Sequence, residues 1–190
     1  DLHSFPTRRS SDLYSCLLEL VRELTTYRHP LASDTRHPLY RAQAERWLEV
    51  QMHEDPGRVD PRLDPRFVYT QVPAVVAGDR SVMDLLGVTR EGRLVVIELK
   101  AEEHLHLPLQ AADYWLRVRW HQQQNDLTRY GYFPGVALQA KPPLVYLVAP
   151  GLRFHPSTDT LLRFLSREME VTRVGLAEDW RRGLRVIFRQ

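Results

Sequence analysis

Residues 81–100 predict a β-hairpin, and this hairpin restricts the possible folds more than any other segment. Residues 81–89 and 93–100 are rich in apolar and β-branched side chains, which is typical of strands. Between them, Arg90-Glu91-Gly92 matches a three-residue hairpin loop, in which a glycine takes the left-handed position. The chain therefore contains an antiparallel strand pair whose register is set by its turn.

That register brings two acidic side chains together. The loop pairs Thr89 with Arg93, and the same pairing continued along the strands places Asp84 opposite Glu98. Opposed Cβ atoms in a sheet lie about 4.5–5.5 Å apart, so both carboxylates can reach one cation. Lys100 lies two residues after Glu98 and shares its face, because side chains alternate along a strand. A slip of one residue in the pairing would undo this arrangement.

Glu98 interrupts a run of otherwise apolar residues between positions 94 and 99. Burial of an unpaired charge is costly, so a metal ion, a cationic partner or water is expected beside this carboxylate. The simpler alternative is an internal ion pair of Lys100 with Glu98 or Asp84 at the edge of the sheet.

A polar ridge follows the hairpin. Residues 107–124 predict a helix, on which Gln110 and Tyr114 lie four residues apart and share a face. Arg117 and His121 continue the same stripe along a helix whose other residues are largely apolar. The alternative for this ridge is a solvated helix surface.

An acidic pair precedes the hairpin. Residues 39–53 predict a helix, on which Glu45 and Glu49 also lie four residues apart. Two acids on one face repel each other mildly, and a nearby cation or solvent relieves that repulsion. Here too a solvated surface is the alternative.

The rest of the chain predicts a mixed sheet between helices. Residues 60–66 contain Asp-Pro-Arg twice and predict a loop, since proline disfavours helix in the residue before it. The remaining expected helices are residues 14–27 and 157–168, and the remaining expected strands are residues 67–76, 143–149, 171–176 and 184–188. This order predicts an α/β fold.

Composition excludes several classes of protein. The basic residues are 24 Arg and 2 Lys, and the net charge is only +2, so no large polybasic field is present. No apolar run approaches the roughly 18–20 residues that span a bilayer. A single cysteine, Cys16, excludes a disulfide framework and a multi-cysteine zinc site, and it favours a reducing, cytoplasmic setting.

Charge is unevenly distributed along the chain. Residues 14–103 carry 12 basic and 15 acidic groups, a net charge of −3, whereas residues 104–190 carry 12 basic and 7 acidic groups, a net charge of +5. A basic second half fits a polyanionic partner, and solvated arginines are the alternative. The scarcity of lysine directs attention to Lys100 and Lys141.

The first 13 residues stand apart from the rest. Their sequence, DLHSFPTRRSSDL, resembles a translated sequencing adaptor and has no periodic pattern, so we exclude it from the fold. A natural disordered tail is the alternative. Residues 1–13 also lack the apolar stretch of a secretion signal. Residues 14–190 are expected to form a single domain.

The motifs in this order resemble the PD-(D/E)xK nuclease superfamily. Asp84 is followed by Glu98-Leu99-Lys100 and then by Gln110 and Tyr114 in a Gln-x-x-x-Tyr helix motif, which is similar to that of the RecB and lambda-exonuclease branches. The resemblance covers residues 39–149. One departure is Met83, where the motif has proline. The resemblance implies a restriction-endonuclease-like αβββαβ core with a mixed central sheet flanked by helices.

By this resemblance, Asp84 and Glu98 are expected to bind Mg²⁺, with Mn²⁺ as the alternative, and the Leu99 carbonyl is a further ligand. Lys100 is expected to position the attacking water and to stabilise the charge that develops on the phosphate. Glu45 is expected to bind a second cation or to orient water, with Glu49 as the alternative for this role.

The helix ridge is expected to serve the same site. Gln110, as a catalytic-site residue, and Tyr114 would each support the site or contact the DNA backbone. Arg117 and His121 are expected to contact DNA. Aromatic residues that could stack on bases, or lie in the core, are Trp115, Trp120, Tyr130, Tyr132 and Phe133.

The sequence thus predicts a metal-dependent nuclease that hydrolyses phosphodiester bonds in DNA. An inactive nuclease-fold module for nucleic-acid binding or assembly is the first alternative, and a globular domain with an internal ion-pair network is the second. No glycine-rich phosphate loop appears, so no nucleotide cofactor is expected. No membrane partner is expected, and the oligomeric state stays open, with a homodimer among the alternatives.

Overall fold

The structure is a computed structural model that describes residues 10–76 and 79–190. Its contacts divide the chain into two compact units, Asp1–Ala44 and Glu45–Gln190. Most of the expected tail, residues 1–13, lies outside the described residues. The expected grouping of residues 14–190 into one domain stays a prediction.

The first unit is helical. Helix α1 spans Ser10–Tyr27, four residues longer at its start than the sequence predicted, and α2 spans Pro38–Arg41. The connection is held by the ring of Tyr27, which stacks on His37 at 3.7 Å between ring centroids, and by the Arg28 guanidinium, which donates to the Leu39 carbonyl. None of the helices in the described part of the chain combines the length and apolar character needed to cross a bilayer.

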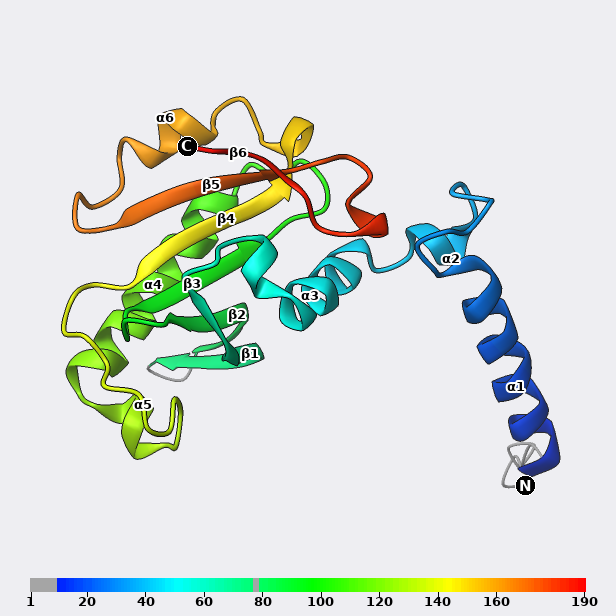
Figure 1. Ribbon diagram of the computed structural model, residues 1–190, viewed down its shortest axis with the longest axis horizontal. Helices are drawn as coiled ribbons and strands as arrows, with labels where there is room; N and C mark the ends of the chain where they lie inside the picture. Colours follow the sequence, from blue (N-terminus) through cyan, green and yellow to red (C-terminus); the bar gives the residue numbers. More distant parts are fainter. Residues whose placement is uncertain (1–9, 77–78) are drawn as a thin grey trace, which may run out of the picture. The chain divides into compact units, whose positions relative to one another are not determined.

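The second unit is built on a six-stranded sheet with its strands in sequence order (Figure 1). β1, β2 and β3 are antiparallel, β3, β4 and β5 are parallel, and β6 returns antiparallel. The strands are β1 Leu63–Val76, β2 Asp79–Thr89, β3 Leu94–Leu99, β4 Leu144–Pro150, β5 Glu170–Leu176 and β6 Val186–Arg189. The helices are α3 Ala44–Glu54, α4 Leu107–Gln123, α5 Asp126–Arg129 and α6 Thr158–Leu162, with short 3₁₀ turns at Pro56–Arg58, Gly151–Arg153 and Trp180–Arg182.

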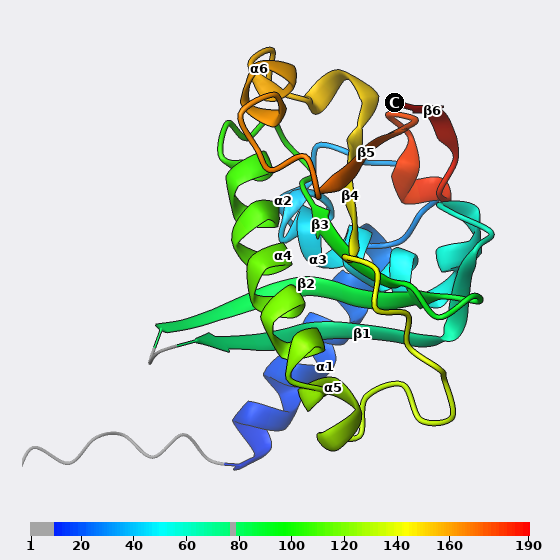
Figure 2. The ribbon, with the colours of Figure 1, turned by 90° about the vertical axis from the view of Figure 1, so that its left-hand side faces the viewer.

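The core lies where α4 packs along the sheet (Figure 2). Every residue of β3 and β4 is buried, which explains their nearly continuous apolar sequence. Ala111 and Trp115 of α4 pack against β4, while Tyr114 and Val118 pack against β2 and β3. This mixed sheet flanked by helices, with the element order αβββαβ from α3 to β4, confirms the expected fold class.

The hairpin has the predicted register. Leu85 pairs with Ile97, and the Thr89 amide donates to the Arg93 carbonyl at 2.8 Å. Gly92 has a φ of +87°, and a Cβ there would collide with the Ala137 carbonyl. Only glycine fits this turn without strain, so the local sequence does determine the pairing.

Two predicted helices are wrong in extent. The helix expected over residues 39–53 is interrupted, because Gln43 has a φ of +46° and separates α2 from α3. The helix expected over residues 157–168 ends at Leu162. Beyond it the chain tightens into a turn in which the Leu165 amide bonds three residues back, and the Phe164 side chain is exposed, so no packing extends the helix.

The double Asp-Pro-Arg sequence forms two matching turns rather than one loop. In each turn the aspartate accepts from the backbone amide and the guanidinium of the arginine two residues later, as in Asp60 with Arg62 and in Asp64 with Arg66. β1 begins at Leu63, between the two turns, four residues earlier than predicted. The register of β1 shifts after Leu63, which accommodates the second turn.

The first of these turns is tied to the centre of the sheet. The buried Tyr146 hydroxyl in β4 donates to Asp60 Oδ2 at 2.6 Å and accepts from Arg62 Nη2 at 2.9 Å. Tyr146→Phe is expected to lower the free energy of unfolding by about 1–3 kcal/mol, because it leaves a buried carboxylate without one of its donors. Chemical denaturation measures this loss. Tyr130→Phe, which changes an exposed ring, is the control, and an equal effect of both changes would contradict the prediction.

Candidate active site

The hairpin brings Asp84 and Glu98 to the same place on the sheet. Asp84 Oδ2 accepts a hydrogen bond from the Leu99 backbone amide at 2.9 Å, which ties this carboxylate of β2 to β3. Glu98 lies on the same face of β3 as Leu94 and Val96, because every second side chain points the same way, and these two residues pack beneath α4. The Glu98 side chain therefore lies on the face that α4 covers, where it is only 2% exposed.

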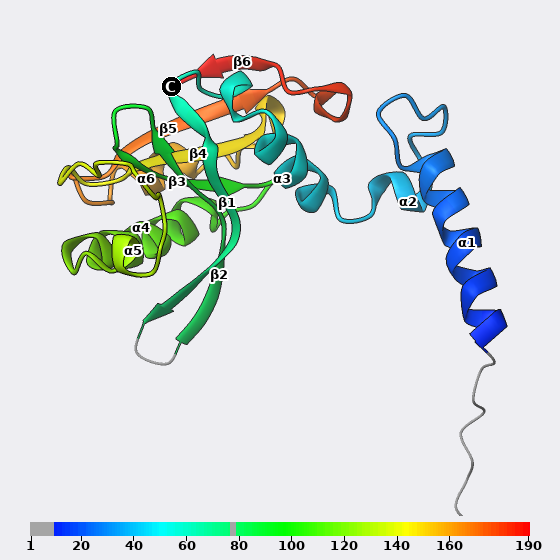
Figure 3. The ribbon, with the colours of Figure 1, turned by 60° about the horizontal axis from the view of Figure 1, so that its bottom comes forward.

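Lys100 completes the cluster. Its backbone amide donates to the Val148 carbonyl of β4 at 3.0 Å, which holds the residue at the end of the buried strand. Its Nζ lies 3.6 Å from Glu98 Oε1 and 3.4 Å from Glu45 Oε2. Glu45 comes from α3, which lies beside the end of β3 (Figure 3). The four side chains Asp84, Glu98, Lys100 and Glu45 form the acid cluster.

Negative charge exceeds positive charge in the acid cluster. Burial, followed by the charge of Asp84, raises the pKa of Glu98 to about 8 against the opposing effect of Lys100. Burial also raises the pKa of Asp84, although the Leu99 amide and Lys100 act against it. Burial alone would lower the pKa of Lys100, but the surrounding carboxylates outweigh it and the pKa is raised. One ammonium group does not compensate the carboxylates around it.

One atom of the acid cluster suits a cation. Glu98 Oε2 is buried and makes no hydrogen bond, which is costly for a carboxylate oxygen. Nowhere among the described residues do three or more His, Cys, Asp or Glu side chains converge as a ready metal cage. Mg²⁺ needs only one or two carboxylates and keeps several waters. Asp84 and Glu98 therefore suit Mg²⁺ better than a metal ion that requires three or more protein side chains.

The choice between Glu45 and Glu49 is visible in their partners. Glu45 pairs with Lys100, whereas Glu49 is 3% exposed and is held by the Arg46 guanidinium and by Gln71 Nε2, which donates to Glu49 Oε2 at 2.9 Å. Glu49 still acts on the site at a distance, because its charge is one of those that raise the pKa of Asp84.

Gln71 is a residue of this region that the sequence analysis missed. Its neighbours Thr70 and Val72 pair with Leu85 and Met83, so Gln71 lies opposite Asp84. Its φ of +51° lies in the left-handed region, which residues other than glycine, asparagine and aspartate rarely adopt. No sequence signal marks a left-handed residue inside a strand, and only the folded backbone reveals it.

The backbone of Gln71 predicts an unusual order of stability. Both Gln71→Ala and Gln71→Gly remove the amide that contacts Glu49, but only glycine takes a left-handed backbone without cost. The glycine variant is expected to be more stable than the alanine variant by about 1 kcal/mol in chemical denaturation. Thr70 lies outside the left-handed region, so Thr70→Ala should be more stable than Thr70→Gly. If glycine were the more stable substitution at both positions, the left-handed backbone of Gln71 would not be the cause.

The packing of α4 over the sheet decides the role of its polar residues. The Tyr114 hydroxyl donates to the Val82 carbonyl at 2.9 Å, and the residue is only 7% exposed. Burial and the charges of Glu98 and Asp84 raise the pKa of Tyr114 to about 12. Tyr114 thus supports the strand that carries Asp84, and its contact with DNA stays a prediction. Gln110 Oε1 is buried without a hydrogen bond.

Arg117 and His121 belong to a different surface. Arg117 Nε donates to Asp113 at 2.9 Å, and His121 Nδ1 lies 2.9 Å from Asp126 Oδ2. Both residues line a pocket of about 540 Å³ whose lining includes none of the acid cluster. Their contact with DNA also stays a prediction.

The aromatic residues divide between core and surface. Trp115 and Phe133 are buried, and the Trp115 indole donates to the Pro143 carbonyl at 2.9 Å. Trp120 and Tyr130 are exposed and remain free of the core. Tyr132 is half-buried and its ring packs edge-on against Tyr69.

Comparison with known proteins gives limited similarity. No family model matches the chain, and no curated protein matches it. Among solved structures, a repair endonuclease from Pyrococcus abyssi is 19% identical over 70% of this chain and 47% of its own, with a TM-score of 0.47. EndoMS in a complex with double-stranded DNA is 20% identical over 76% of this chain and 49% of its own, with a TM-score of 0.48. EndoMS in its apo form is 19% identical over 68% of this chain and 43% of its own, with a TM-score of 0.43.

The chain thus spans less than half the length of each of these three structures. At this degree of similarity the chemistry of the acid cluster has to be inferred from its own residues.

Proposed function

We propose that this chain is a metal-dependent nuclease that hydrolyses phosphodiester bonds in DNA. The observation that carries the proposal is the Asp84–Glu98 pair with Lys100 beside it and with Glu98 Oε2 buried and unpartnered. A carboxylate pair with excess negative charge and a free oxygen is suited to a divalent cation, and a lysine at the same point is suited to phosphate chemistry.

Asp84 and Glu98, with the Leu99 carbonyl, would hold Mg²⁺, with Mn²⁺ as the alternative. When bound, the ion polarises the phosphate and lowers the pKa of water. The Leu99 amide keeps Asp84 oriented, and burial beneath α4 keeps Glu98 dry, which strengthens the attraction of both carboxylates for a cation.

Lys100 would act on the attacking water and on the charge that develops at the phosphate. Its ammonium is a compact charge with three donors, and it already lies within 3.6 Å of Glu98 and 3.4 Å of Glu45. Glu45, whose side chain is half exposed, would accept a proton from that water or orient it, while Glu49 keeps Gln71 and Arg46 in place.

DNA as the substrate is proposed from the motif resemblance and from the net charge of +5 over residues 104–190. The ion pairs of Lys100 with Glu45 and Glu98 also favour a second candidate, a module that binds nucleic acid without cutting it. In that case Lys100 serves only to neutralise buried carboxylates.

Incubation of the purified chain with linear, circular and single-stranded DNA separates these candidates. Cleavage is expected with Mg²⁺ or Mn²⁺ and none in EDTA. Undiminished cleavage in EDTA would overturn the metal requirement. Binding of DNA with no cleavage of any substrate would favour the second candidate.

A further inference from the structure

The second lysine of the chain lies at the opposite end of the central strands from the first. Lys100 follows the end of β3, whereas Lys141 precedes the start of β4, and the two strands are parallel. Figure 1 shows this end of the sheet at the β2–β3 turn, away from α3. The distance along β3 from Arg93 to Glu98 is roughly 17 Å, at about 3.3 Å per residue.

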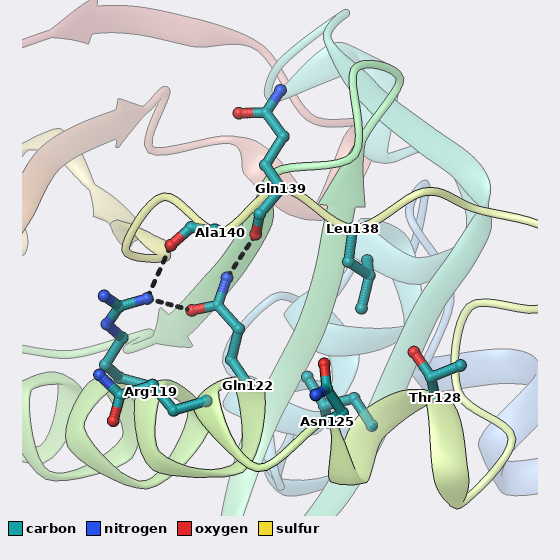
Figure 4. A pocket seen from close by; sticks show the side chains of 9 residues that line it. Arg119, Gln122, Asn125, Thr128, Leu138, Gln139 and Ala140 are labelled. Carbon is teal, nitrogen blue, oxygen red and sulfur yellow. Dashed lines mark hydrogen bonds between the residues drawn. The ribbon is translucent and has the colours of Figure 1, made fainter.

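Two pockets meet at this end of the sheet and share Gln139. The first, of about 320 Å³, is lined by four basic residues and a single acid: Arg62, Arg90, Arg93, Lys141 and Glu91. The second, of about 390 Å³, is lined by Arg119, by amide and hydroxyl side chains and by three apolar residues, with no carboxylate (Figure 4).

Ion pairs compensate only part of this positive charge. Arg62 is paired with Asp60, and Arg93 is held by both carboxylate oxygens of Glu170. Within the described part of the chain, Arg90, Lys141 and Arg119 form no ion pair with a carboxylate within 4.0 Å. At longer range, the charge of Arg90 helps to lower the pKa of Asp64 and that of Lys141 helps to lower the pKa of Glu170. Glu91 is the one acid that lines either pocket, so positive charge predominates.

Arg119 is the most buried of these three residues, since Arg90 and Lys141 are exposed. Its Nη1 donates to the Ala140 carbonyl at 2.8 Å and to Gln122 Oε1 at 2.9 Å, as Figure 4 shows, while its Nε is buried without a hydrogen bond. A half-buried guanidinium that is met only by neutral acceptors is incompletely compensated. An anion at this surface would lower that cost.

The surface is also rigid. The Gln139 amide donates to the Gly92 carbonyl at 2.9 Å, and Gln139 Nε2 donates to the Glu91 carbonyl at 2.8 Å. Gln122 Nε2 bonds the carbonyls of Gln139 and Lys141 from the other side. The turn, the segment before β4 and the end of α4 are thereby locked together, so little conformational freedom is lost when a ligand binds.

We propose that Arg90, Lys141 and Arg119, the hairpin-end surface, bind the phosphate backbone of double-stranded DNA at a point separate from the acid cluster. The choice of DNA rests on the proposed function. The roughly 17 Å along β3 from Arg93 to Glu98 corresponds to about five base pairs at 3.4 Å each, a span well within the length of one short duplex. The surface would hold the duplex while the acid cluster acts on it.

The test is binding of a fluorescent 20-base-pair duplex in EDTA over a series of salt concentrations. In Arg90→Gln/Lys141→Gln, the slope of log affinity against log salt is expected to fall in magnitude by about 1.8, since each phosphate contact contributes about 0.9. The matched control is Arg163→Gln/Arg167→Gln, which removes the same charge from exposed positions after α6. Arg119 is left intact because its side chain holds the Ala140 carbonyl.

An unchanged slope in the Arg90/Lys141 variant, an equal fall in both variants, or no binding by the wild-type chain would overturn the hairpin-end surface. These outcomes do not depend on cleavage. If the wild-type chain fails to cut DNA but the slope falls only in the Arg90/Lys141 variant, the surface stands and the proposed nuclease function fails. If the wild-type chain cuts DNA and the slope is the same in the wild-type chain and the Arg90/Lys141 variant, the nuclease function stands and the hairpin-end surface fails.

Discussion

Asp84→Asn and Lys100→Ala are each expected to lower the rate of metal-dependent DNA cleavage by about 10²–10³-fold or more, the usual loss when one group that stabilises charge in the transition state is removed. Asp84→Asn removes one of the two carboxylates that would hold the cation, and Lys100→Ala removes the ammonium next to Glu98. Single-turnover cleavage at saturating DNA measures the chemical step apart from binding.

Lys100→Arg sharpens this test. It keeps the positive charge, but the planar guanidinium cannot take the place of a compact ammonium between Glu98 and Glu45. We expect it to remain as slow as Lys100→Ala, although a role in charge neutralisation alone would be restored by arginine. Cleavage persisting in both Asp84→Asn and Lys100→Ala would remove the acid cluster from the mechanism.

Surface changes of the same kind serve as controls. Asp179→Asn and Arg167→Ala alter exposed residues outside the acid cluster and the hairpin-end surface, so each should cleave DNA at the wild-type rate. Thermal unfolding of all variants checks that a loss of cleavage is not a loss of folded protein.

The second large effect concerns stability in the absence of metal. The pKa of Glu98 is about 8 in the folded chain because of burial and the charge of Asp84, against 4.5 for the ordinary side chain. A carboxyl with a higher pKa in the folded state binds protons preferentially to that state. Its contribution to stability is therefore complete below about pH 4.5 and is lost as the pH rises to about 8.

The free energy of unfolding in EDTA is thus expected to fall by a few kcal/mol between pH 5 and pH 8, since one pKa unit corresponds to about 1.4 kcal/mol. The pKa of Asp84 is raised as well and adds to the fall, and Lys100, whose pKa is raised, stays charged throughout this range. Urea denaturation at each pH measures it. A stability that rises or stays level over this interval would contradict the expectation.

Glu98→Gln provides the matched variant. The neutral amide does not titrate, so most of the fall between pH 5 and pH 8 should disappear and the variant should exceed the wild-type chain in stability at pH 8. Mg²⁺ should stabilise the wild-type chain at pH 8 and should not stabilise Glu98→Gln, because ligand binding to the folded state adds to its stability. Equal stabilisation of both chains would place the ion elsewhere.

The hairpin shows how far local sequence reaches. Arg90-Glu91-Gly92 determines the turn, the turn determines the register, and the register brings Asp84 to Glu98. All of these interactions join residues close in sequence, and alternation along β3 then places Lys100 on the same face. This part of the acid cluster could be predicted because no distant packing was needed.

Other residues depend on contacts between distant segments. Glu45 and Glu49 look equivalent in the sequence. Only the packing of α3 beside β3 brings Glu45 into an ion pair with Lys100 and Glu49 into a hydrogen bond with Gln71. The same holds for Tyr114, whose bond to Val82 directs it to support β2.

The sequence by itself thus determined the α/β class, the central hairpin and the pairing of its two carboxylates, because turn chemistry and strand periodicity are local properties. The tertiary structure alone decided which glutamate meets Lys100, that Gln71 adopts a left-handed backbone, and that Arg90, Lys141 and Arg119 gather around Gln139. These features arise where segments far apart in the chain pack together, and side-chain burial and charge balance there depend on the whole fold.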